Sequence, residues 1–114
     1  MPKRLEKSIV KGILEMLNSI PRCVAFKRQA GPGRRGQPDI TGCYWGMRIE
    51  IEAKALGGTV SKLQKEKLLF WKKAGAITGV AYNECDAWDI IRYILTPDDK
   101  EICRKFLQKK KQIC

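Results

Sequence analysis

The segment from Met47 to Lys54 constrains the fold most, because hydrophobic and charged residues alternate along it. Successive side chains of an extended strand point to opposite faces. The alternation therefore predicts a strand with one apolar face and one charged face. The apolar face would carry Ile49, Ile51 and Ala53, and the charged face Glu50, Glu52 and Lys54.

A second strand is expected just upstream, from Ile40 to Trp45, with Gly46 in the turn between the two. In such a hairpin Asp39 lies beside Glu52. At about 4 Å and an effective dielectric constant near 20, two carboxylates repel by roughly 4 kcal/mol, and a divalent cation removes that conflict. Carboxylate oxygens, water and substrate phosphate are the ligands that Mg²⁺ prefers. Lys54, on the same face, could polarise an attacking water or neutralise charge on a phosphate.

A purely structural explanation exists for each half of this arrangement. Pro38-Asp39 is also a common turn sequence, since Asp can accept a hydrogen bond from the backbone two residues on. Alternating Glu and Lys on an exposed strand also form ordinary cross-strand charge pairs. The combination of the two halves, rather than either one, favours a catalytic site.

Pro38-Asp39 followed by Glu52-Ala53-Lys54 resembles the signature of the PD-(D/E)XK nucleases. Between Glu6 and Tyr82 the chain is similar to one family among them, the virus-type replication-repair nucleases (VRR-NUC). The likeness rests on four elements in order: Glu6 in an amphipathic stretch, Gly36-Gln37-Pro38-Asp39, Glu52-Ala53-Lys54, and Ser61-Lys62-Leu63-Gln64 at the start of a helix.

The resemblance implies a restriction-endonuclease-like core and hydrolysis of DNA phosphodiester bonds with Mg²⁺ or Mn²⁺. Asp39, Glu52 and the Ala53 carbonyl would bind the metal, with help from Glu6. Lys54 would be the catalytic lysine, and Gln64 would orient water or phosphate beside it. Stand-alone relatives further imply a homodimer that acts on branched DNA such as Holliday junctions, in a phage or bacterial setting.

Two of these residues also have simpler interpretations, and a further residue, Glu50, has no assigned role. Glu6 lies off the apolar stripe of its helix, as a solvated residue would. Gln64 stands three residues after Ser61, where a capping box places a glutamine for structural reasons. Glu50 has no place in the family pattern, and we expect it at the rim of the site.

The charge balance indicates a polyanionic partner. The chain has 114 residues, enough for one domain, and its 23 Lys and Arg against 12 Asp and Glu give a net charge of +11. The basic residues cluster before Pro38 and in the C-terminal segment. They are Lys27, Arg28, Arg34 and Arg35, predicted to contact nucleic acid, and Arg104, Lys105, Lys109, Lys110 and Lys111 in the tail.

The cysteines and the lack of histidine exclude several other site types. Five cysteines show no Cys-x-x-Cys spacing and there is no His, which argues against structural zinc and against Ser-His-Asp or Cys-His catalysis. No apolar run approaches the roughly 18 residues of a membrane span, so no membrane association is expected. We expect buried or incidental thiols in a reducing cytoplasm, bacterial or that of a phage-infected host.

Periodicity and capping residues predict an α/β fold with a mixed sheet and the order αβββαβαα over residues 1–114 as a single domain. Asn83 would cap one helix, and the basic C-terminal helix would begin at Thr96-Pro97. A literal Gly-x-Gly-x-x-Gly pattern occurs at Gly31, Gly33 and Gly36, but it leads into a strand-like run, which argues against dinucleotide binding. The predicted helices and strands cover about 5–20, 22–29, 39–45, 47–54, 61–73, 76–82, 83–95 and 97–114.

The sequence leaves two rivals to the nuclease. One is a non-catalytic module that binds nucleic acid through its basic loop and tail. The other is a basic structural protein that meets nucleic acid only nonspecifically.

Overall fold

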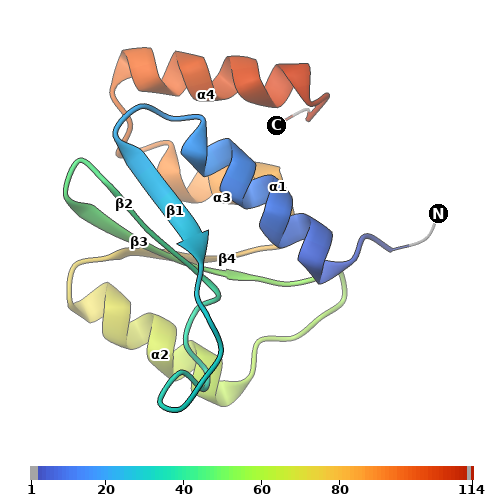
Figure 1. Cartoon of the computed structure of the whole chain (residues 1–114), viewed down its shortest axis with the longest axis vertical. Coiled ribbons are helices and arrows are strands. Elements are labelled where there is room, and N and C mark those ends of the chain that lie inside the picture. The colour runs from blue at the N-terminus through green and yellow to red at the C-terminus, as the bar shows by residue number, and fades with distance from the viewer. Residues whose placement is uncertain (1–2, 113) are drawn as a thin grey trace.

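The computed structural model describes residues 3–112 and 114, which form a four-stranded mixed sheet with helices on both faces (Figure 1). The strand order is β1-β2-β3-β4. Strand β2 pairs antiparallel with both β1 and β3, and β4 runs parallel to β3. The elements are α1 (Glu6–Asn18), β1 (Cys23–Lys27), β2 (Ile40–Tyr44), β3 (Met47–Ala53), α2 (Lys62–Lys73), β4 (Ile77–Ala81), α3 (Glu84–Ile91) and α4 (Pro97–Lys109). The predicted α/β class is confirmed.

The hydrophobic core lies between the sheet and the helices α1, α3 and α4, which stand on the face opposite to α2 (Figure 1). Helix α1 buries its apolar stripe there, as its 3.6-residue period predicts. The apolar face of β3 contributes Ile49, Ile51 and Ala53, each at most 1% exposed. The alternation read from the sequence is therefore confirmed for this face of the strand.

Three helix starts are fixed by the predicted capping side chains. Ser61 and Gln64 form a complete capping box at α2, while Asn83 and Thr96 accept hydrogen bonds from backbone N–H groups at the starts of α3 and α4. Pro97 occupies the first turn of α4, where its missing N–H costs nothing. These local predictions are confirmed because the partner atoms lie within one turn of the chain.

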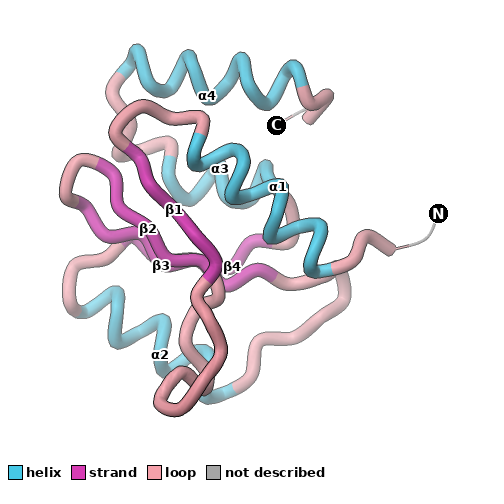
Figure 2. Tube along the Cα trace, in the orientation of Figure 1, coloured by secondary structure: helices cyan, strands magenta, loops and turns pink. Residues whose placement is uncertain are grey.

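The glycine-rich segment between β1 and β2 is a long loop that extends beyond the sheet toward α2 (Figure 2). Gly36 has φ +76°, and a Cβ there would lie 2.5 Å from Cγ of Leu63. Glycine is required at that position both for its conformation and for the close approach. The loop leads into β2, as expected, and not into a helix.

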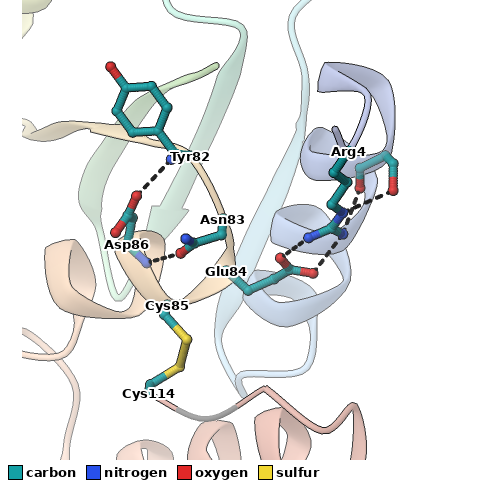
Figure 3. A network of polar contacts seen from close by, with 8 residues as sticks. Arg4, Tyr82, Asn83, Glu84, Cys85, Asp86 and Cys114 are labelled. Atoms are coloured by element: carbon teal, nitrogen blue, oxygen red, sulfur yellow. Dashed lines mark hydrogen bonds and ion pairs between the residues drawn. A yellow bond between two sulfur atoms is a disulfide. The ribbon is translucent and has the colours of Figure 1, made fainter. Parts of the chain in front are cut away.

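The expectation of incidental thiols is wrong for two of the five cysteines. Cys85 at the start of α3 forms a disulfide with Cys114, and the two Cα atoms are 5.2 Å apart (Figure 3). Next to Cys85, Glu84 pairs with Arg4, so this region also holds the N-terminal segment. The pair spans 29 residues, which no local pattern reveals. The redox argument for a reducing compartment therefore does not hold for this pair.

None of the helices in the described part of the chain is both long and apolar enough to cross a lipid bilayer.

Candidate active site

The β2-β3 hairpin places Asp39 beside the end of β3. Ile40 pairs with Ile51, so the preceding residue, Asp39, stands next to Glu52 and Ala53. Asp39 Oδ1 accepts a hydrogen bond from the Ala53 N–H at 2.8 Å. The N–H and C=O of one strand residue point to the same edge, so the Ala53 carbonyl is directed to the side where Asp39 lies.

Glu52 is the central group of this site. Its side chain is nearly buried, and its two carboxylate oxygens have different surroundings. Oε2 accepts a hydrogen bond from Gln64 Nε2 at 3.2 Å and lies 3.5 Å from Lys54 Nζ. Oε1 is buried without a hydrogen-bond partner, the one carboxylate oxygen in this condition among the described residues. Glu52 thus has one oxygen with partners and one buried oxygen without any.

The charges at the site act on one another. Burial, and then the neighbouring Asp39 carboxylate, raise the pKa of Glu52 to about 7. Burial also raises the pKa of Asp39, although its hydrogen bond from Ala53 opposes that change. Glu6, the first residue of α1, adds to both effects through its negative charge. Its own side chain is exposed.

These residues fit a hard divalent cation such as Mg²⁺ or Mn²⁺. The donors are oxygens, one of them buried and without a partner, and the two carboxylates repel each other in the absence of positive charge. Among the described residues, no three His, Cys, Asp or Glu side chains meet as a ready metal-binding group. A cation here would therefore be held by Asp39, Glu52 and the Ala53 carbonyl, with the remaining positions left to water and phosphate.

Gln64 lies at the site, next to Glu52. Its Oε1 accepts the Ser61 N–H in the capping box, and its Nε2 donates to Glu52. Both ends of the side-chain amide are therefore engaged. Through its Nε2, Gln64 helps to orient the Glu52 carboxylate.

Glu50 is not at the rim, and that expectation is wrong. Its carboxylate is fully buried and contacts Arg28 at 2.5 Å, Arg48 at 2.8 Å and the Thr41 hydroxyl. Two guanidinium groups and a hydroxyl satisfy both of its oxygens. The alternation of β3 gave the correct face. Of the partners, Arg48 lies on β3 itself, whereas Thr41 of β2 and Arg28 of the loop after β1 are brought to Glu50 only by the folded sheet.

The four basic residues expected to contact nucleic acid divide into two groups. Lys27, Arg34 and Arg35 are exposed. Arg28 is only 10% exposed and is held by Glu50. The tail bases lie on or just after α4, at the end of the molecule opposite to the loop between β1 and β2 (Figure 1). The two basic clusters therefore do not form one surface.

Sequence reasoning missed the aromatic residue that organises this arginine pair. Trp71 of α2 lies under the Arg48 guanidinium at 4.7 Å and the Arg28 guanidinium at 5.5 Å, measured to the ring centre. Its indole N–H donates to Gln37 Oε1 at 2.9 Å. Trp71 thus ties α2 to the loop that ends in Asp39. A tryptophan on an amphipathic helix gives no sequence signal that separates this role from ordinary packing.

Comparison with protein-family models finds no match to the chain, and comparison with curated proteins finds none either.

Proposed function

We propose that this protein is a divalent-metal-dependent DNA endonuclease of the PD-(D/E)XK type, with a restriction-endonuclease-like core. The observation that carries the proposal is the Glu52 carboxylate. Its Oε1 is buried without a hydrogen-bond partner, the side chain lies beside Asp39, and its Oε2 is 3.5 Å from Lys54 Nζ. A buried carboxylate left unsatisfied costs stability, and such a cost is commonly found where a ligand or cation binds. The likeness to VRR-NUC nucleases supports the same conclusion.

The chain's own residues would divide the work as follows. Asp39, Glu52 and the Ala53 carbonyl would hold the cation, and Gln64 would keep Glu52 oriented. When bound, the cation would supply charge to polarise the phosphate and lower the pKa of an attacking water. Lys54, with its ammonium next to Glu52, would stabilise negative charge that develops on the phosphoryl oxygens.

The reaction is a hydrolysis in which a water oxygen bonds to phosphorus and the bond from phosphorus to the 3′ oxygen breaks. One proton of that water ends on the 3′ oxygen, and the products are a 3′ hydroxyl and a 5′ phosphate. Lys54 acts on the charge that this step creates, so its contribution is made mainly in the transition state.

The test compares nicking of supercoiled plasmid in Mg²⁺ by the unchanged chain, by Lys54→Ala and by Lys65→Ala. We expect Lys54→Ala to lose about 10²- to 10³-fold in rate, the typical value of one group that stabilises developing charge. Lys65 is an exposed lysine of α2 and serves as the matched control. DNA binding in Ca²⁺ should survive in both variants, because each removes one charge of many. Cutting by Lys54→Ala at the original rate would overturn the proposal.

The rival is a non-catalytic DNA-binding module. It is favoured by the Lys54–Glu52 ion pair, which already neutralises part of the buried charge without a cation. Binding of DNA without metal-dependent nicking, under conditions in which Mg²⁺ binds to the chain, would select this rival.

The resemblance also supports a homodimer acting on branched DNA, because a two-fold dimer could address two strands symmetrically. Light scattering would give the mass in solution, and a four-way junction compared with linear duplex would give the preference. We expect a dimer and faster cutting of the junction. A monomer that cuts both DNAs equally would contradict this part.

A further inference from the structure

The sheet face on which α2 packs is covered over only half its width. Helix α2 packs mainly against β3 and β4, so β1 and part of β2 remain open on that side. Along β1, Cys23 and Ala25 are buried toward α1, while Val24 and Phe26 are 64% and 58% exposed on the opposite face. Phe26 is thus an aromatic ring presented to solvent on a rigid strand.

Two hollows border the segment that follows β1, one on this open face and one at Asp39. One, of about 600 Å³, is lined by Phe26, Thr41, Arg48 and Trp71. The other, of about 630 Å³, is lined by Glu6, Pro38 and Asp39. They share one wall, made of Lys27, Arg28, Gln29, Arg34 and Gln37. Nucleic acid beside Phe26 would therefore contact some of the same basic residues that border Asp39, although Glu52 and Lys54 line neither hollow.

We propose that this groove holds the unpaired segment of a DNA substrate, with a base stacked on Phe26 and the backbone phosphates against Lys27 and Arg34. The inference rests on the proposed nuclease function and names its substrate class: DNA with unpaired nucleotides beside the bond that is cut. The Arg28 and Arg48 guanidinium groups lie over the Trp71 ring, so Phe26 is the aromatic ring of this hollow that remains accessible for stacking.

The chemistry of the groove selects an unpaired strand over a duplex. An aromatic side chain can stack only on a base whose face is accessible, and in a continuous duplex the faces are covered by neighbouring base pairs. Exposed Lys27 and Arg34 neutralise phosphates without regard to sequence. The net charge of +11 gives the whole chain the sign that a polyanion requires. A solvent-exposed apolar ring between cations is the arrangement found in proteins that bind single strands.

The test measures binding in Ca²⁺, where no cutting is needed, to a fluorescent oligothymidylate and to a blunt duplex of equal length. We expect Phe26→Ala to weaken binding of the single strand by about tenfold, the typical loss of one stacked base, and to leave duplex binding unchanged. Phe26→Tyr should retain single-strand binding. Val24→Ala is the matched control, since Val24 shares the strand and face but lines neither hollow.

Several outcomes would overturn the inference. These are an equal loss for both DNAs, no loss with either, an equal effect of Val24→Ala, or tighter binding to RNA of the corresponding sequence. A dimer that dissociates on Phe26→Ala would show that the ring belongs to a contact between two copies. If the plasmid is not nicked but the Phe26 effect on single strands remains, the nuclease fails and the single-strand groove stands.

Discussion

Glu50 and Glu52 lie two residues apart on the same face of β3, yet the fold treats them in opposite ways. Glu50 is fully buried and contacts two guanidinium groups and a hydroxyl. Glu52 is equally enclosed but has Lys54 and Gln64 on one oxygen and nothing on the other. The same side chain thus has all its oxygens paired at one position and one buried oxygen without a partner at the other.

The difference lies in how each buried charge is compensated. A buried acid whose oxygens are all satisfied contributes to the fold, because removing either partner leaves an uncompensated charge. A buried acid with a free oxygen remains costly until something positive reaches it. Glu84 and Asp99, the other buried acids among the described residues, resemble Glu50 in having protein partners. Glu52 is therefore the exception to be explained.

The largest effect is expected from Glu50→Gln. It leaves Arg28, at 10% exposure, without its anionic partner, and the free energy of unfolding should fall by about 3 kcal/mol. Denaturation in urea measures this value. Glu15→Gln makes the same change in an exposed ion pair with Lys110 and should cost less than about 1 kcal/mol. Equal losses at the two positions would remove the basis of the comparison.

Burial of Glu52 should make the stability of the metal-free protein depend on pH. The folded pKa of about 7 lies above the ordinary value of 4.5, so the folded state binds the proton more tightly than the unfolded state. The free energy of unfolding should therefore be greatest at low pH in this range and fall as pH rises from about 4.5 to 7.

Urea denaturation in EDTA across this range is the measurement. Glu52→Gln carries no charge at any pH and should flatten the curve, apart from the smaller contribution of Asp39, whose pKa is raised in the same direction. A curve that rises between these pH values, or one that Glu52→Gln leaves unaltered, would show that Glu52 is not destabilised by its burial.

A smaller effect is expected from divalent metal. At neutral pH, Mg²⁺ or Mn²⁺ at tenfold its dissociation constant should raise the free energy of unfolding by about 1.4 kcal/mol. Thermal unfolding at several metal concentrations would follow this change. Glu52→Gln should abolish it and Glu15→Gln should not, since only the first removes the open oxygen. Equal stabilisation of both variants would place the metal elsewhere.

The smallest effect separates the two groups of basic residues. Arg34→Ala should reduce the slope of log affinity against log salt for duplex DNA by about 0.9, the share of one phosphate, without changing stability. Arg28→Ala should instead lower stability, because it removes one of the two guanidinium partners of the buried Glu50 carboxylate. Fluorescence anisotropy in a salt series would give the slope for each variant, and urea denaturation would give its stability. An unchanged slope for Arg34→Ala would argue against a phosphate contact there.

The sequence by itself determined the elements that depend on neighbours along the chain. The alternation of β3, the apolar stripe of α1 and the caps at Ser61, Asn83 and Thr96 involve atoms within one or two turns, and each was predicted from residue type. The hairpin with Gly46 in its turn also follows from local pattern, and it brings Asp39 to Glu52.

Only the tertiary structure decided how each charge is compensated. Arg28 reaches Glu50 from 22 residues away, Trp71 reaches Gln37 from 34 away, and Cys85 and Cys114 join across 29. The physical reason is that periodicity fixes the face on which a side chain lies, whereas its partner depends on strand pairing and helix packing between distant segments. Sequence therefore predicted two glutamates on one face. The fold gave one of them partners for both oxygens and left one oxygen of the other without a partner.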